Sequence, residues 1–280
     1  TGGTGGTGRE AAADQLDRAF RTASALHTDA GLDLVVAPVP TRTGAVVRRL
    51  TDRYALSVTP MVAGTAGRFG PHPSGDRTEV VDLLARLHRA TPAVADTAPR
   101  LDLTLPGRDR LHGALADLDR QWTAGPYGEP ARRLLAGRAG YVAGLLTDFD
   151  RLVDRVRRSG AAPVVTHGEP HPGNLLRTRD GLRLVDWDTV RLAPPERDLW
   201  MLTPAFDRLA GGEPDGQVGD LLDRYTGATG RTVTVDGLAL WPLWWELADI
   251  AGYVDDLRRP HGDTADTAAA WTYLSGYLDS

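Results

Sequence analysis

The sequence has no cysteine, no lysine and no apolar run near twenty residues. The missing cysteines exclude disulfides, thiolate zinc sites and cysteine nucleophiles. Because lysine is absent, all 32 basic residues are arginines, and no ammonium side chain is available to hold a phosphate group. Since no charged-then-apolar leader is present either, we expect a cytoplasmic chain with no membrane partner.

Charge and composition narrow the class of protein. The formal net charge is −5, and no basic stripe is interleaved with aromatic residues, so nucleic acid is not an expected partner. A cationic small molecule suits this charge better. A length of 280 residues with 41% hydrophobic residues allows a small lobe joined to a larger one.

The first part of the chain predicts a small β-containing lobe. Residues 1–8 form a Thr-Gly-Gly repeat with nothing to bury, so this segment should be flexible. A helical pattern runs from Arg9 to about Asp29. Three short β-rich segments follow, separated by turn residues: Leu34–Ala37, Ala45–Leu50 and Tyr54–Val62. We therefore expect an N-terminal lobe and hinge over residues 9–64.

The remainder, residues 65–280, predicts a mainly helical C-terminal lobe. It begins with a segment rich in glycine and proline that indicates a hinge. Helical spacing of apolar residues then recurs in several stretches. These are Glu79–Ala90, Arg108–Trp122, and about 130–158, 196–209, 215–226 and 237–279, the last with breaks near Pro260. The fold class is α+β.

The segment from Val164 to Trp200 interrupts the helices and carries the most informative polar residues. Two apolar pieces flank an Asp-Gly pair at residues 180–181, which favours a hairpin. If residue 175 lies opposite 185, Asn174 and Asp186 face each other at the open end. An amide oxygen and a carboxylate side by side are ligands that Mg²⁺ accepts, with water and phosphate oxygens completing its shell.

A third polar residue, Glu169, sits on a loop bent by two prolines five residues before Asn174. Its carboxylate can accept or orient the proton of an attacking hydroxyl while the metal neutralises phosphate charge. The alternative is that Asn174 and Asp186 only cap a hairpin and His167 is a satisfied core residue. Zinc binding by His167 and His171 is not favoured, because the prolines exclude a helix there.

The order His167-Gly-Glu169-x-x-x-x-Asn174, followed by Asp186, resembles the catalytic loop and metal-binding aspartate of the aminoglycoside phosphotransferase and choline kinase family. This family has the bilobal protein-kinase-like fold. The resemblance implies that Glu169 is the catalytic base, that Asn174 and Asp186 bind the metal, and that His167 is structural. It implies that Asp198 braces the loop.

The resemblance also implies that the cofactors are ATP and Mg²⁺. The strand and hinge whose backbone receives adenine match Tyr54–Gly64, and their candidate residues are Met61, Val62, Ala63 and Gly64. The expected reaction is phosphoryl transfer to a small hydroxylated molecule. An aminoglycoside or related antibiotic is the first expectation, and choline, homoserine or a sugar is the alternative.

Three features depart from the family pattern. Glu169 stands where the family has aspartate, the small-lobe lysine is absent, and the family's glycine-rich loop and first strands have no counterpart before Arg9. The small lobe is thus expected to lack its first strands or to be abbreviated. These departures also motivate a rival interpretation, a degenerate kinase-like protein that binds a ligand without transferring phosphate.

Acceptor specificity in this family lies in the helical lobe, where the C-terminal helices combine aromatic and acidic residues. Helical spacing places four of them on neighbouring faces: Trp245, Glu246, Asp249 and Tyr253. Such a surface can hold an amino-sugar through carboxylate–ammonium pairs and ring stacking. An aromatic core stripe with a solvated acidic edge explains the same pattern.

Overall fold

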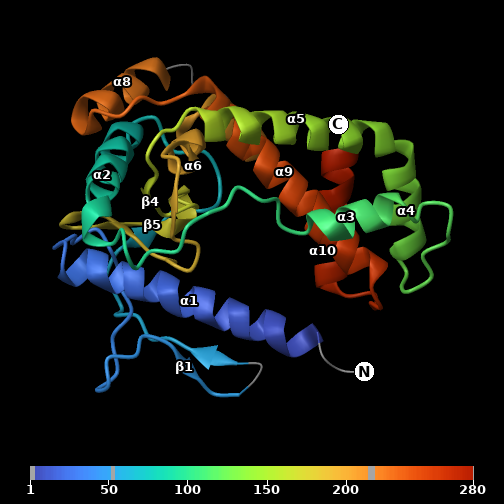
Figure 1. The fold of residues 1–280 in the computed structure, drawn as a ribbon, viewed down its shortest axis with the longest axis horizontal. Helices are drawn as coiled ribbons and strands as arrows, with labels where there is room; N and C mark the ends of the chain where they lie inside the picture. Colours follow the sequence, from blue (N-terminus) through green and yellow to red (C-terminus); the bar gives the residue numbers. More distant parts are fainter. Residues whose placement is uncertain (1–3, 52–53, 214–217, 280) are drawn as a thin grey trace. The chain divides into compact units, whose positions relative to one another are not determined.

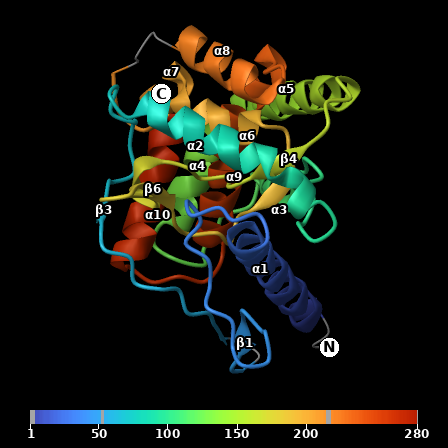
Figure 2. The same ribbon diagram turned by 90° about the vertical axis from the view of Figure 1, so that its left-hand side faces the viewer.

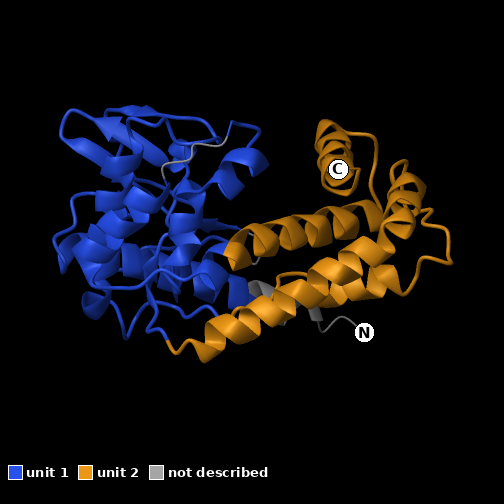
Figure 3. Cartoon of the chain, turned by 90° about the horizontal axis from the view of Figure 1, so that it is seen from above, with its two compact units in different colours: residues 1–102, 161–238 blue, residues 103–160, 239–280 orange. Residues whose placement is uncertain are grey.

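The computed structural model describes residues 4–51, 54–213 and 218–279. The chain divides into two compact units, coloured in Figure 3. Unit 1 comprises Thr1–Asp102 and Ala161–Leu238, and unit 2 comprises Leu103–Gly160 and Ala239–Ser280. The lobe boundary expected between residues 64 and 65 falls inside unit 1, so it does not coincide with this division and stays a prediction.

Unit 1 contains the described strands and the segment that carries the candidate site (Figure 1). Its longer helices are α1 (Thr4–Thr28), α2 (Arg77–Arg89) and α8 (Val218–Thr229). Its short helices are η1 (Thr91–Ala93), η2 (Pro172–Asn174), α6 (Glu196–Leu199), η3 (Trp200–Leu202) and α7 (Pro204–Leu209). Its strands are β1 (Arg48–Arg49), β2 (Ala55–Leu56), β3 (Thr65–Ala66), β4 (Val164–Thr166), β5 (Leu175–Thr178), β6 (Gly181–Leu184) and β7 (Arg191–Ala193).

The core of unit 1 forms around α2. Its apolar residues recur at helical spacing, so Val80, Leu84 and Leu87 share one face and are fully buried. They pack in one cluster with Leu26 of α1 and Tyr225 of α8. Helices α2 and α8 lie side by side in Figures 1 and 2. This core supports the strands that carry the candidate catalytic residues.

The hairpin β5–β6 forms as expected, but in a register shifted by one residue. Leu175 pairs with Leu184, not with residue 185, because the turn is the two-residue link between Thr178 and Gly181. Gly181 has φ +110°, a conformation that favours glycine. Asn174 therefore lies opposite Val185, whose N–H donates to the Asn174 carbonyl at 3.0 Å. Asp186 comes one residue later.

The N-terminal elements differ in extent from their prediction. The first helix already begins at Thr4, within the segment expected to be flexible, and residues 1–3 lie outside the described residues. Leu34–Ala37 is not a strand and makes only an isolated bridge from Val35 to β6. Strands β1 and β2 keep two residues each of the expected segments, and all four are exposed. Figure 2 shows this pair apart from β3 and β6.

Unit 2 is helical in its described part. It contains α3 (Arg108–Leu115), α4 (Gly128–Gly137), α5 (Ala139–Arg158), most of α9 (Val235–Arg258) and α10 (Ala265–Leu278). The single helix expected over about 130–158 is two helices, because Arg138 leaves helical geometry between α4 and α5. The break expected near Pro260 is confirmed. Within the described ranges, no helix is long and apolar enough to cross a membrane.

Candidate active site

The loop between β4 and β5 carries the candidate base. Glu169 is half-buried and follows Gly168, which has φ +102° and leads the chain out of β4. The side-chain amide of Asn174 donates to the Glu169 carbonyl at 3.0 Å. The N–H of Asn174 donates to the His171 carbonyl at 2.9 Å, closing the turn η2. The loop thus folds back on itself and places Glu169 and Asn174 together.

Asp198, from helix α6, fixes the backbone of this loop. Its fully buried carboxylate accepts the N–H groups of His167 at 2.9 Å and Gly168 at 2.6 Å. His88 of α2 contacts the same carboxylate at 3.0 Å. Burial would raise the pKa of Asp198, but the His88 hydrogen bond and nearby cationic groups hold it below its usual value. The carboxylate is therefore ionised at neutral pH.

His167 is fully buried, and both of its ring nitrogens have protein partners. Its Nδ1 accepts the Glu169 N–H at 3.2 Å, and its Nε2 contacts the Val185 carbonyl at 2.9 Å. Burial lowers its pKa, so the ring is neutral at physiological pH. With both nitrogens used in this way, His167 connects the loop to the strand before Asp186 and has no nitrogen left for zinc.

Asp186 directly follows Val185, whose N–H is bonded to the Asn174 carbonyl, so the backbones of the two metal candidates are neighbours. Asp186 is exposed and has φ +65°. Burial, followed by the negative charge of Asp186, raises the pKa of Asp188. The carboxylates of Asp186 and Asp188 are therefore close enough to repel each other. Because the Asn174 amide nitrogen is used by Glu169, its oxygen is the atom suited to a cation.

These residues fit a magnesium ion that phosphate oxygens help to hold. No group of three or more His, Asp or Glu side chains is arranged around a common point in the described ranges. Mg²⁺ commonly takes only one or two protein ligands and completes its octahedron with water and substrate phosphates. The amide oxygen of Asn174 and the carboxylate of Asp186 match that donor set.

The hinge candidates Met61 to Gly64 form an irregular segment between β2 and β3. Met61, Ala63 and Gly64 are exposed, and Val62 is half-buried. A Cβ added to Gly64 would lie 2.7 Å from the Arg177 carbonyl and 2.8 Å from Leu176 Cγ. The backbone of this hinge candidate therefore lies directly against β5, the strand that follows Asn174, and leaves no room for a Cβ at Gly64.

The acceptor candidates belong to α9 in unit 2, where two half-buried carboxylates accept tyrosine hydroxyls. Tyr141 donates to Glu246 at 2.9 Å, and Tyr277 donates to Asp249 at 2.8 Å. Burial raises the pKa of both carboxyl groups, and these hydrogen bonds oppose the shift. The Trp245 side chain also hydrogen-bonds Asp249. The structure thus joins these acidic and aromatic groups in one cluster.

Tyr253 completes this set. Its ring stacks on Tyr273 at 5.7 Å between centroids. Burial raises its pKa to about 12, so its hydroxyl stays protonated at neutral pH.

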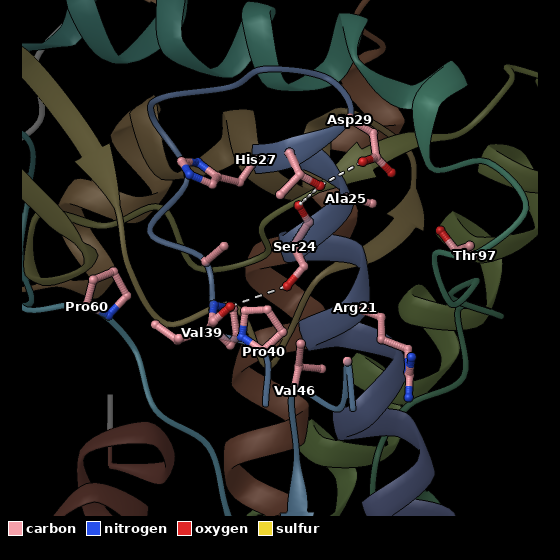
Figure 4. A pocket seen from close by; sticks show the side chains of 14 residues that line it. Arg21, Ser24, Ala25, His27, Asp29, Val39, Pro40, Val46, Pro60 and Thr97 are labelled. Atoms are coloured by element: carbon pink, nitrogen blue, oxygen red, sulfur yellow. Dashed lines mark hydrogen bonds between the residues drawn. The ribbon is translucent and has the colours of Figure 1, made fainter. Parts of the chain in front are cut away.

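A separate pocket of about 570 Å³ lies between the end of α1 and the segment 37–46 (Figure 4). Its wall combines proline and aliphatic side chains with Arg21 and Asp29, and the Ser24 hydroxyl donates to the Pro38 carbonyl at 3.5 Å. Pro60, just before the hinge, also lines it. The pocket contains none of the candidate catalytic residues.

Sequence reasoning missed several residues that hold the loop. His88 and Tyr225 form a hydrogen bond of 2.8 Å behind Asp198, and they lie 137 positions apart. Arg197 packs under Gly168. Nothing in the spacing of these residues marks them, since only the folded chain brings them together.

Comparison with known proteins places the chain in a family. The model of the phosphotransferase enzyme family (APH) matches residues 8–234. Protein StrN from Streptomyces griseus is 30% identical over 264 residues, which are 91% of this chain and 75% of that protein.

Solved structures are similar in fold. Spectinomycin phosphotransferase APH(9)-Ia, in complex with ADP and spectinomycin, has a TM-score of 0.72 at 16% identity, covering 92% of this chain and 78% of that one. Choline kinase LicA from Streptococcus pneumoniae has a TM-score of 0.53 at 14% identity, covering 96% and 83%. The chain therefore belongs to the phosphotransferase enzyme family, and it is a small-molecule kinase with the α+β kinase-like fold that its catalytic loop implied.

Proposed function

We propose that this protein transfers the terminal phosphoryl group of ATP to a hydroxyl of an aminoglycoside or related antibiotic, with Mg²⁺ as the metal. The observation that carries the proposal is the loop itself. Asp198 accepts hydrogen bonds from its backbone, the Asn174 side chain donates to the Glu169 carbonyl, and Asp186 follows the residue bonded to Asn174, in a member of a phosphotransferase family. Such a transfer would be an antibiotic-resistance activity.

Each residue has a distinct role in this proposal. Asn174 and Asp186 hold Mg²⁺, which when bound neutralises phosphate charge. Glu169 orients the acceptor hydroxyl and accepts its proton. The transition state of phosphoryl transfer is loose and demands little basicity, so glutamate can serve in place of aspartate. His167 and Asp198 keep the loop in place.

The nucleotide is bound by the hinge backbone at Met61, Val62, Ala63 and Gly64. Because this backbone lies against β5, adenine bound there would lie near the strand that begins after Asn174. With no lysine in the sequence, an arginine holds the phosphates, in a fork geometry unlike that of an ammonium group.

The acceptor is bound by Trp245, Glu246, Asp249 and Tyr253. Burial raises the pKa of both carboxyl groups, Glu246 and Asp249. A bound cation would stabilise their ionised form and offset this cost of burial. An amino-sugar offers ammonium groups for the carboxylates and a ring face for the aromatic residues. The structural neighbour solved with ADP and spectinomycin supports this class. Choline, homoserine or a sugar is the alternative acceptor.

A second function, ligand binding without transfer, is favoured by the glutamate at position 169 and the absent lysine. A coupled ADP-release assay over a panel of aminoglycosides, choline, homoserine and sugars separates the two functions. Mass spectrometry then identifies the phosphorylated acceptor.

The assay includes matched variants of two glutamates. We expect Glu169→Ala to lower kcat by roughly 10²–10⁴-fold, the usual contribution of a positioned base. The exposed Glu213 provides the control, and Glu213→Ala should keep full activity. Nucleotide binding without turnover of any acceptor would contradict the proposed transfer and leave the binding function.

A further inference from the structure

The catalytic loop lacks a side chain at the position where protein kinases carry an arginine. Their loop has the pattern H-R-D-x-x-x-x-N, whereas here Gly168 lies between His167 and Glu169. The φ of +102° at Gly168 favours glycine. At position 168, where a protein kinase has arginine, this loop therefore carries no guanidinium group.

The side chain of Arg197 fills the space beside this glycine. A Cβ built on Gly168 would lie 2.3 Å from Nη2, 2.5 Å from Cζ and 2.6 Å from Nη1 of Arg197. All three distances are too short for a real contact, so the guanidinium occupies the place where a side chain at Gly168 would begin. Arg197 precedes the bracing residue Asp198 on helix α6.

Two hydrogen bonds fix the guanidinium on both sides of the loop. Nη1 donates to Thr166 Oγ1 at 2.8 Å, at the end of β4, and Nη2 donates to the Thr189 carbonyl at 2.9 Å. The Thr189 hydroxyl in turn donates to the His167 carbonyl at 2.7 Å. Arg197 is only 9% exposed. Its position is therefore determined by the fold and not by solvent.

The charge of this guanidinium acts on Glu169. Burial lowers the pKa of Arg197 to about 10, while the charges of Asp198 and Glu169 oppose that shift. Arg197 is thus a cation at neutral pH. Both hydrogen bonds given above end on neutral oxygens, so its charge reaches the two carboxylates through space.

We propose that Arg197 is a positioning residue for the catalytic loop, which supplies from helix α6 the guanidinium that the loop lacks and so holds Glu169 in its working geometry. The inference rests on the proposed phosphoryl transfer. It assigns Arg197 no contact with substrate. Displacing a catalytic group by about 1 Å can cost roughly 10²-fold in rate.

The test compares two arginines whose guanidinium groups are held by the protein. Arg132 of α4, in unit 2, is 19% exposed and pairs with Glu129 at 2.7 Å, so Arg132→Lys is the control for Arg197→Lys. We expect both variants to melt at lower temperature. Only Arg197→Lys should lower kcat, by roughly 10–100-fold, with the KM for ATP unchanged.

Chemical rescue of kcat is a second measurement. If Arg197 only stabilised the fold, added guanidinium ion would not restore kcat. Arg197→Ala opens a space of the shape of a guanidinium, and added guanidinium ion at non-denaturing concentration should restore part of kcat. The same ion should not restore Glu169→Ala. Equal kcat for Arg197→Lys and Arg132→Lys, with no rescue, would overturn the positioning role alone. An unmodified protein without turnover would overturn the proposed function and, with it, this role.

Discussion

The buried ring of His72 contacts the loop that carries the candidate base Glu169. It is 3% exposed, and its ring hydrogen-bonds the Pro170 carbonyl, next to Glu169. Its Nε2 has no hydrogen-bond partner in the described part of the chain. Burial, followed by the charge of Arg77, lowers its pKa from 6.5 to about 4. The folded state therefore resists protonation of this ring.

This shift makes stability depend on pH in a defined window. Between pH 4 and 6.5 the unfolded chain binds the proton and the folded chain does not, so stability falls as pH falls. Lowering the pH from 7 to 4 should remove up to about 3 kcal/mol of unfolding free energy through His72.

Denaturant unfolding at several pH values measures the effect. His72→Gln should reduce the dependence but not abolish it, because burial also lowers the pKa of His171 to about 4, whereas His112→Gln, at an exposed histidine, should retain it in full. An unchanged pH slope in His72→Gln would refute the assignment.

Asp186 provides the second prediction for a single residue. Asp186→Asn keeps the shape of the side chain but removes the charge that a hard cation needs. We expect the Mg²⁺ concentration for half-maximal rate to rise at least about tenfold, equivalent to ~1.4 kcal/mol of binding. A magnesium titration of the phosphotransfer rate measures this. The same half-maximal concentration in both proteins would show that Asp186 does not bind the metal.

Some residues of the candidate site can be recognised from a local sequence motif, and others only from contacts in the folded protein. Glu169, Asn174 and Asp186 lie within eighteen positions of one another and form a readable motif. His88 contacts Asp198 from 110 positions away, and no local pattern indicates such a contact. The burial of these side chains and the partners that they contact depend on tertiary packing. A single sequence does not reveal that packing.

Among the elements, α2 offers the clearest prediction about stability. Leu84 is fully buried in the core cluster, and Arg86, two residues along the same helix, is exposed. Leu84→Ala should lower the unfolding free energy by about 2–5 kcal/mol, because it leaves a cavity. Arg86→Ala should change it by less than about 0.5 kcal/mol. Similar losses in both variants, measured by denaturant unfolding, would contradict the packing described for α2.

The helices were easier to predict than the strands. The bounds of helix α2 agree with the predicted ones to within two residues. A single stripe of apolar residues on this helix packs against the core, and the sequence displays that stripe. The strand candidates of the first 64 residues are apolar segments without a fixed partner, and only β1 and β2 form, with two residues each. The β5–β6 register differs by one residue because the turn geometry, not the Asp-Gly pair alone, sets it.

At the scale of the whole molecule, the proposed roles divide between the two units. The proposed hinge and the proposed catalytic loop belong to unit 1, and the acceptor candidates belong to unit 2. Hydrogen exchange with ADP alone should slow the amides of residues 61–64 and 167–188. A bound amino-sugar should slow those near residues 245–253. Protection by ADP confined to unit 2 would refute the assigned nucleotide site.

The bracing of the loop through Asp198 also bears on how the protein matures. The series from Tyr225 to His88, from His88 to Asp198 and from Asp198 to Gly168 joins residues 137, 110 and 30 positions apart. Contacts at such separations form late, because long loops must close first. A ribosome that has not yet delivered Tyr225 therefore holds a chain whose proposed catalytic residues are all synthesised, while the His88 ring behind Asp198 still lacks its Tyr225 partner.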